Sequence, residues 1–205
     1  MRFANLKKIP PDPAARMLAV ANTKLMTQVR APASAPVSVV LTELEAGGAL
    51  FDMLHLLAVA LPVRESVWWA CLAARDIMVL KGIEKAPPPL DAAEKWVFKP
   101  NDEQRITARA ALDSADIDDD TVHCALAALY AEGTLGPGEL AEFPAPPSAV
   151  STSVFTMNMI SLRAHVKVME THGQMLVDRA LDIARGGNGR VEAKAVAASD
   201  TEGAG

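Results

Sequence analysis

The sequence predicts an all-α protein, a single multi-helix domain of roughly seven or eight helices followed by a disordered C-terminal tail. Hydrophobic residues make up 50% of the 205 residues and aromatic residues only 4%, so the core must consist of Ala, Leu, Val and Met. Ala and Leu are strong helix formers, whereas the β-branched runs typical of strands are scarce. Signals that begin and end helices also recur along the chain.

Four helices are predicted in the first half of the chain. Asp12 before Pro13 is the cap and first-turn arrangement that begins a helix, and an apolar stripe continues it to about Gln28. Three more are bounded by serine, glycine or proline, over residues 39–46 with Ser38 as cap, 49–61, and 64–80 closed by Gly82. The prolines at 87–89 then predict a stiff, extended connector.

Capping residues also place the helices that follow. Asp91 is expected to cap a short helix over residues 92–98. Asn101, with Gln104 three residues later, has the spacing of a capping box and begins a helix that ends near residue 115.

The remainder of the domain is predicted to contain two more helices. The acidic run at 118–120 precedes a helix over residues 121–132 that ends at Gly133. A loop with one turn spans residues 134–147. One long helix then runs from Ser148 or Ser151 to residue 185, and Gly173 marks a kink or a close helix contact within it.

These signals divide the chain into three parts. Residues 1–11 form an N-terminal extension rich in proline near its end, and residues 12–185 form the helical domain. Residues 186–205 begin with a glycine-rich helix end and continue as small, polar and aperiodic sequence, which predicts a flexible tail.

Charge and hydropathy bear on the location of the protein and exclude several kinds of partner. The formal net charge of −5 and the pI of about 5.4 argue against nucleic acid and against adsorption to an anionic membrane. The apolar stretch 49–61 is shorter than the roughly 20 residues of a membrane span, so no membrane insertion is expected. No apolar signal region follows the N-terminal charges, and two isolated cysteines fit a reducing cytosol, so a cytoplasmic location is predicted.

No motif in the sequence carries catalytic chemistry. The only thiols, Cys71 and Cys124, fall within helical patterns. Arg75 lies one turn from Cys71, and a nearby arginine lowers the pKa of a reactive thiol. A cysteine on an apolar helix face is nevertheless more typical of a core residue. The sequence therefore predicts a protein that is not an enzyme and uses no cofactor.

The four histidines do not predict a metal site. They are His55, His123, His165 and His172, and no pair has the i,i+4 spacing of helical ligands. His165 and His172 share one face of the predicted last helix, but two turns separate them by roughly 10 Å. That distance is too long for one ion unless the helix bends at Gly173.

Two adjacent tryptophans are the most distinctive feature of this aromatic-poor chain. On a helix Trp68 shares a face with Arg64 and Arg75, whereas Trp69 points about 100° away. A tryptophan–arginine face is a common anchor at protein interfaces, so Arg64, Trp68, Trp69 and Arg75 are the candidate partner-binding residues. The other interpretation, which the composition of cores favours, is that both rings pack in the core with a fringe of ion pairs.

The last predicted helix is a second candidate surface because it carries four of the nine methionines. Methionine-rich helix faces adapt to varied apolar partners, but methionine is also an ordinary gap filler of cores. The four residues are Met157, Met159, Met169 and Met175.

The stretch LPVRESVWWACLAAR, residues 61–75, resembles an uncharacterised bacterial family with an LPxREAVWWAC-type signature. Ser66 stands where the signature has alanine. Members of that family resemble accessory proteins found beside type VI secretion components, such as spike-tip and adaptor proteins. The resemblance implies no activity, catalytic residue or cofactor, and suggests an accessory or adaptor role in a bacterial cytoplasm.

The leading hypothesis is a non-enzymatic helical adaptor or chaperone-like accessory protein that binds another protein, a secretion-system component or effector in the type VI setting. The alternative is a helical module for a small molecule or lipid, in which the apolar helix from Ala49 and the tryptophan pair line a pocket. An enzyme that uses Cys71 or a histidine has the least support.

Overall fold

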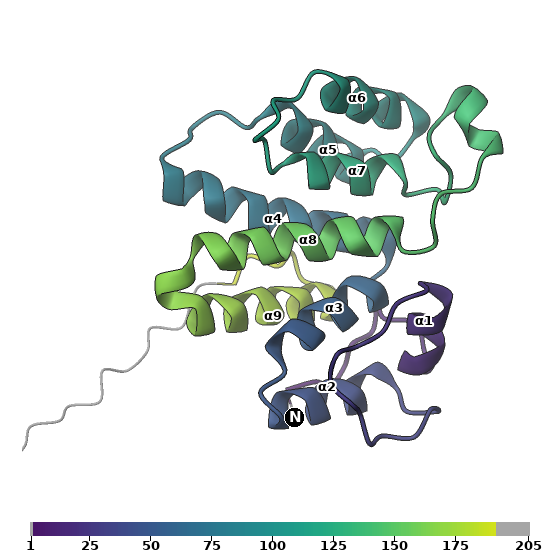
Figure 1. The fold of residues 1–205 in the computed structure, drawn as a ribbon, viewed down its shortest axis with the longest axis vertical. Coiled ribbons are helices and arrows are strands. Elements are labelled where there is room, and N and C mark those ends of the chain that lie inside the picture. The colour runs from purple at the N-terminus through teal and green to yellow at the C-terminus, as the bar shows by residue number, and fades with distance from the viewer. Residues whose placement is uncertain (1, 192–205) are drawn as a thin grey trace, which may run out of the picture.

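The computed structural model describes residues 2–191, and all of its regular structure is helical (Figure 1). Within this range nine α-helices and two short 3₁₀ helices follow one another, and β contacts are limited to the isolated bridges Pro13–Pro36 and Thr134–Pro144. The predicted all-α class is therefore confirmed. Most of the predicted tail, from residue 192 onward, lies outside the described residues.

The helices have the following bounds: α1 Ala14–Val20, α2 Val37–Ala46, α3 Leu50–Ala60, α4 Val63–Lys81, α5 Pro88–Phe98, α6 Asp102–Asp113, α7 Val122–Leu129, α8 Ala149–Ala164 and α9 Met169–Arg185. The 3₁₀ helices are η1, Gly138–Glu142, and η2, Val166–Val168. No helix in the described part is long and apolar enough to cross a membrane.

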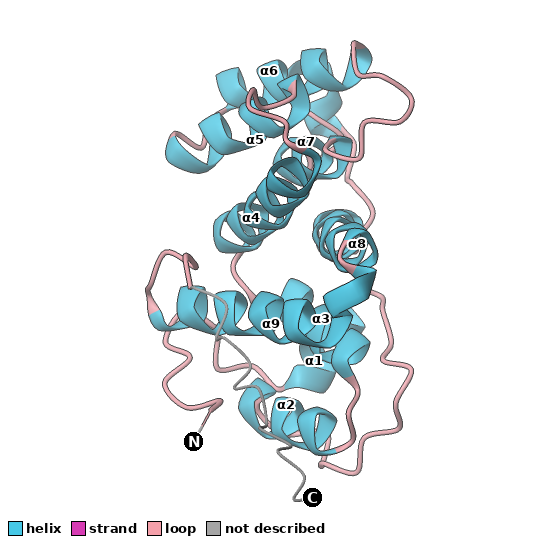
Figure 2. Ribbon diagram, turned by 90° about the vertical axis from the view of Figure 1, so that its left-hand side faces the viewer, coloured by secondary structure: helices cyan, strands magenta, loops and turns pink. Residues whose placement is uncertain are grey.

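Two helices form the middle of the molecule, and the others cover them from two sides. α4 and α8 lie side by side, with α5, α6 and α7 on one side and α1, α2, α3 and α9 on the other (Figures 1 and 2). Trp69 and a set of leucines from α2, α3, α5 and α9 are completely buried between these helices. Aliphatic side chains from successive helices thus supply most of the core, as the composition predicts.

The first helix is much shorter than predicted. α1 ends at Val20 because Asn22 adopts a left-handed conformation, with φ of 48°, and its N–H donates to the carbonyl of Ala19. Asparagine tolerates this conformation and commonly ends a helix with it. Residues 21–36 then run as a loop instead of continuing the helix to Gln28.

Carboxylates on α2 and α3 hold that loop. Asp52 is buried and accepts the backbone N–H groups of Met26 at 2.9 Å and Thr27 at 2.7 Å. The carboxylate of Glu43 accepts the backbone N–H groups of Arg30 and Ala31. Two helix-borne carboxylates therefore satisfy four loop amides, which a helix over this stretch would have paired internally.

Two other predicted helix starts are also wrong. α2 begins at Val37 after Pro36, and Ser38 lies inside it rather than capping it. Pro88 and Pro89 form the first turn of α5, not an extended connector, and Asp91 lies within that first turn. Proline fits a first turn because the missing N–H would have no partner there.

The predicted long last helix is two helices. α8 ends at Ala164, η2 forms a tight turn, and α9 begins at Met169 (Figure 1). The break, residues 165–168, lies five to eight residues before Gly173, which therefore does not mark a kink. The alternative prediction, a close helix contact at Gly173, is confirmed. An ideal Cβ there would lie 2.4 Å from Cδ2 of Leu50 on α3.

The N-terminal segment, predicted as an extension, lies against α9. The ring of Phe3 is buried, and the N–H of Lys8 donates to the carbonyl of Ala184 at 2.8 Å. The guanidinium of Arg2 bonds the carboxylates of Glu45 and Asp178. The segment is thereby fixed between α2 and α9, and it leads into α1, which packs against α3.

Candidate binding groove

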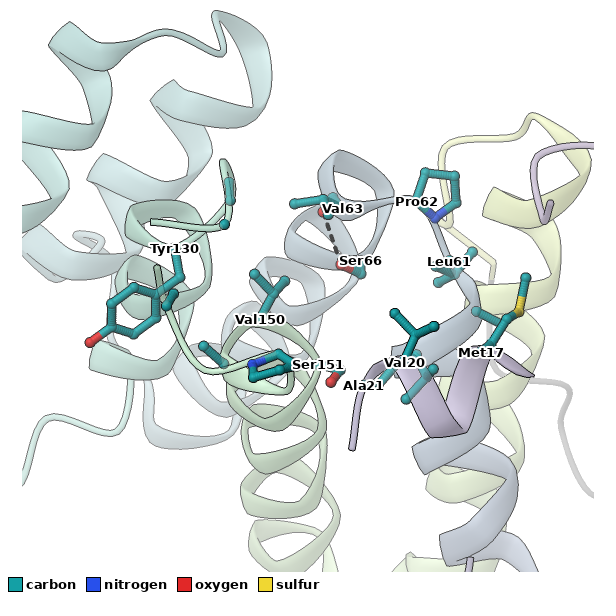
Figure 3. Close-up of a pocket in the computed structure, with 18 of the residues that line it drawn as sticks. Met17, Val20, Ala21, Leu61, Pro62, Val63, Ser66, Tyr130, Val150 and Ser151 are labelled. Carbon is teal, nitrogen blue, oxygen red and sulfur yellow. Dashed lines mark hydrogen bonds between the residues drawn. The ribbon is translucent and has the colours of Figure 1, made fainter. Parts of the chain in front are cut away.

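An apolar groove of about 580 Å³ opens between α1, the α3–α4 junction and the start of α8 (Figure 3). One wall comes from Pro10, Asp12 and α1, and the floor is residues 58–63 and Ser66. The opposite wall comes from residues 130–133 after α7 and residues 145–151 at the start of α8. Three segments far apart in the sequence thus meet around one hollow.

Prolines shape the floor and one wall of the groove. Pro62 separates α3 from α4, so the two helices meet at a corner that displays aliphatic side chains. Pro146 and Pro147 lie just before α8 and bring its first turn to the same corner. The hydroxyl of Ser66 in the floor donates to the carbonyl of Val63 at 2.9 Å, so it adds little polarity to the surface.

The groove is accessible to solvent and has few polar groups. Val20 is 70% exposed and Val63 is 38% exposed, an unusual degree for side chains that face one hollow. Among the lining residues, charge is confined to Asp12 and Arg16, whose side chains pair at 3.3 Å at the start of α1. Such a surface binds apolar groups and has little capacity for acid–base chemistry.

Sequence reasoning missed this groove, although part of its floor lies in the apolar stretch 49–61. Its walls come from segments that have no distinctive pattern of their own, and these segments meet only in the folded chain. The cluster of prolines at 144–147 was the available signal, because it indicates a fixed backbone near the start of α8.

The four predicted partner-binding residues occupy two different environments on α4. Trp69 is completely buried, and its indole N–H donates to the carbonyl of Leu176 at 3.0 Å. Trp68 is half-buried, and its N–H donates to the carbonyl of Asn188 at 2.7 Å. Of the pair, only Trp68 lies where a partner can reach it.

Trp68 borders two hollows of about 370 and 340 Å³. Phe98 is 73% exposed, and the centroid of its ring lies 6.1 Å from the centroid of the Trp68 ring. Arg64 lines one hollow and donates from Nε to the carbonyl of Val97 at 2.6 Å. Arg75 lines the other and is paired through Nε with Glu94 at 2.7 Å.

The two thiols are core residues. Cys71 and Cys124 are buried without a disulfide. Burial raises the pKa of the Cys71 thiol, the neighbouring Cys124 raises it further, and the opposing effect of Arg75 is smaller. The possibility that Arg75 activates Cys71 is therefore not supported by the surroundings of the thiol.

The predicted separation of His165 and His172 is wrong, because the break between α8 and α9 folds one histidine onto the other. Their rings stack with centroids 3.8 Å apart. His172 is buried, and its Nε2 lies 2.9 Å from Oγ of Ser161 and 3.9 Å from Oδ2 of Asp76. Asp76 also forms an ion pair with Arg179 on α9.

The electrostatic surroundings of His172 favour its neutral form. Burial and then the neighbouring His165 lower the pKa of His172 to about 4, although Asp76 opposes them. Ser161 and Asp76 approach the same ring nitrogen, whereas a nucleophile and an orienting carboxylate must use opposite nitrogens. In the described residues no group of three or more metal-ligating side chains surrounds a common point.

Comparison with known proteins places the chain in a family. No curated protein and no solved structure matches it. Residues 40–184 match the model of the Family of unknown function (DUF6931), and this is more than half of the 205 residues. The match begins within α2, so the wall of the groove formed by α1 precedes it. The chain therefore belongs to the Family of unknown function (DUF6931).

Proposed function

We propose that the protein is a non-enzymatic accessory protein, an adaptor or chaperone-like module, that binds an apolar segment of a partner protein. The observation that carries the proposal is the open apolar groove beside the α3–α4 corner. Aliphatic side chains and prolines make up most of its floor and walls, and its one ion pair, Asp12–Arg16, lies at the start of α1. Apolar side chains of a partner gain free energy there by leaving water.

The form of the groove favours a chain that continues beyond it. It is an exposed slot between α1 and α8, and Val20 and Val63 remain solvent-accessible on opposite sides of the corner. Small-molecule sites usually enclose most of the surface of their ligand. A peptide segment needs only one side covered, since its backbone can remain hydrated on the other.

The face around Trp68 is a second contact surface for the same partner. Val63 on the first turn of α4 lines the groove, and the next residue, Arg64, lines a hollow beside Trp68. The two surfaces thus adjoin around the start of one helix. A half-buried tryptophan beside arginine supplies stacking and cation–π anchors that complement an apolar groove.

The type VI secretion setting is the finer part of the proposal, and it rests on the signature in residues 61–75. Leu61 and Pro62 of that signature lie in the floor of the groove, and Arg64 lines a hollow beside it. The signature also contains the tryptophan pair. An accessory protein of a secretion apparatus must hold an effector or structural subunit without modifying it, which suits a binding surface with no catalytic groups.

A lipid or other apolar small molecule is the second candidate occupant. The observation in its favour is that the last turn of α3, the helix predicted to line a ligand pocket, forms part of the floor. The volume of about 580 Å³ lies within the usual range for small-molecule pockets.

Site-specific photo-crosslinking separates these possibilities. A photoreactive residue replaces Val20 in the groove, and in the control it replaces Ile106, another accessible residue, on α6, that is 58% exposed. The proposal expects a protein adduct from cells of the native bacterium at Val20 and not at Ile106. A lipid or metabolite adduct at Val20 supports the second candidate, and equal labelling at both sites contradicts both.

Binding of the purified partner then tests the groove directly. Val63→Asp places a charge in the apolar floor at a position exposed enough to preserve folding. We expect it to weaken binding by at least tenfold in calorimetry, whereas Ile106→Asp leaves the affinity unchanged. Circular dichroism establishes that both variants are folded. Unchanged affinity of Val63→Asp would locate the partner elsewhere.

A further inference from the structure

Six of the fifteen exposed large hydrophobic residues lie at one end of the molecule, in two short segments. One segment closes α4 and the other joins α8 to α9. Isolated exposed hydrophobic residues are normal, but a concentration of this kind marks a surface that meets something apolar. The six are Val79, Leu80, Ile83, Val166, Val168 and Met169, with exposed fractions from 41% to 82%.

Contacts beneath the surface fix these two segments together. Asp76, one turn before Leu80, forms an ion pair with Arg179 on α9 and lies 3.9 Å from the ring of His172. His172 stacks on His165 in the turn that leads to Val166. Both segments lie at the same end in Figure 1, and Figure 2 looks directly at that end. We call this surface the tip.

The backbone at the tip is closed by its own hydrogen bonds. Gly82 is left-handed with φ of 65°, its N–H donates to the carbonyl of Val79, and the N–H of Ile83 donates to that of Met78. This arrangement satisfies carbonyls at the end of α4. The apolar side chains can therefore leave water without exposing those carbonyls to an apolar medium.

The charged residues interspersed with the tip are predominantly basic. Four exposed cations and two exposed anions lie in residues 79–85 and 163–170, and none of them forms an ion pair with a described residue. The cations are Lys81, Lys85, Arg163 and Lys167, and the anions are Glu84 and Glu170. The tip thus has a local charge of +2 (four minus two) on a chain with a net charge of −5.

We propose that the tip docks on the surface of an anionic lipid membrane, with its aliphatic side chains in the interfacial region and its lysines and arginine among the headgroups. Charges farther away than about 8 Å are screened at physiological ionic strength, so the local charge decides the attraction and not the net charge of the chain. The expectation from net charge alone, that the protein avoids anionic membranes, does not extend to this end.

Charge complementarity distinguishes this occupant from a second copy of the chain. Two tips brought face to face would place one local charge of +2 (four minus two) against another, which opposes association. An anionic lipid surface attracts each of the same cations. The tip is short and comes from two helix ends, so the contact is peripheral and involves no spanning segment.

Vesicle co-sedimentation of the full chain tests the proposal. The vesicles are equal parts phosphatidylglycerol and phosphatidylcholine, compared with phosphatidylcholine alone. We expect the wild-type protein to pellet only with the anionic vesicles and to be released by high salt. The double variant Leu80→Asp/Lys167→Glu alters one apolar and one basic residue of the tip, and we expect it to lower the partition coefficient by at least tenfold.

A matched double variant supplies the control. Met26→Asp/Lys24→Glu makes the same kinds of change on two exposed residues of the 21–36 loop, away from the tip. We expect it to bind anionic vesicles as wild type does. The proposal is overturned if wild type stays in the supernatant, or if both double variants lose binding equally. It is also overturned if light scattering shows a dimer that the tip variant converts to monomer.

Discussion

Trp68 and Trp69 are neighbours in sequence, yet they contribute to different properties of the molecule. The 100° between successive residues of a helix directs Trp69 to α9 and Trp68 to the surface beside Phe98. Trp69 therefore contributes mainly to stability. Trp68 retains an accessible ring, so it is the member of the pair that suits a partner.

Substitution by phenylalanine separates the two roles. Trp69→Phe removes part of a completely buried ring and its hydrogen bond to the carbonyl of Leu176, so we expect a loss of about 2–3 kcal/mol in the free energy of unfolding. Trp68→Phe changes a half-buried ring and should cost about 1 kcal/mol or less. Urea titration followed by circular dichroism measures both values. Equal losses would contradict this assignment of the pair.

His172 gives the protein a pH dependence whose sign follows from its surroundings. Its pKa is about 4 in the folded protein and about 6.5 when unfolded, so the unfolded chain binds the proton more readily. The stability contributed by neutral His172 is complete above pH 6.5 and is lost progressively as the pH falls toward 4. The loss is at most about 3 kcal/mol over that window.

Replacement of the titrating ring tests this dependence. His172→Gln retains a polar group near Ser161 but cannot titrate. We expect the urea unfolding free energy of the wild type to fall more steeply than that of the variant between pH 6.5 and 4. His123→Gln gives a comparison outside the buried cluster: burial lowers the pKa of His123 as well, so any acid dependence that it contributes is measured separately. Parallel curves for wild type and His172→Gln would assign the acid sensitivity to other groups.

At the scale of helices, the sequence predicts whether a helix exists better than it predicts where that helix ends. Local signals located α3, α4 and α6 within one or two residues, because glycine, proline and capping residues act on their own neighbours. The loop that replaces the rest of the predicted first helix is held by Asp52, which lies 26 and 25 residues after Met26 and Thr27, whose amides it accepts. The break after α8 is accompanied by the stacked histidines. Such contacts exist only once the chain has folded, which is also why the groove was missed.

One cap that the sequence identified provides an element-scale prediction. The side chain of Asn101 accepts the backbone N–H of Gln104 at 3.0 Å at the start of α6. Asn101→Ala should therefore cost about 1 kcal/mol of stability. Ser148 precedes α8 without a side-chain cap bond, so Ser148→Ala should change stability by less than about 0.5 kcal/mol. Similar urea midpoints for the two variants would contradict a capping role for Asn101.

At the scale of the whole molecule, the groove requires a segment that precedes the family match. Residues 40–184 supply its floor and one wall, and α1 supplies the other wall. α1 is anchored on one side by Arg2 and Lys8 and on the other by the loop held on Asp52. The integrity of the groove is therefore coupled to polar contacts outside it, of which those of Asp52 are buried.

Asp52 is the residue through which this coupling can be tested. Burial alone would raise the pKa of Asp52, but hydrogen bonds from Thr27 and Met26 lower it overall, so the carboxylate is charged and fully engaged at neutral pH. Asp52→Ala leaves two loop amides without acceptors, which costs about 1–3 kcal/mol. Part of that cost is avoided if the loop detaches and its amides become hydrated.

Detachment has a distinctive signature in hydrogen exchange. For Asp52→Ala we expect faster exchange in residues 21–36 and in α1, while α4 and α8 keep their protection because their contacts lie on the far side of α3. Asp113→Ala, which removes an exposed carboxylate at the end of α6, should change neither region. Because α1 forms a wall of the groove, partner binding should weaken in step with the loss of protection in α1. Uniform acceleration throughout the chain would instead show that the loop and the helical core unfold as one unit.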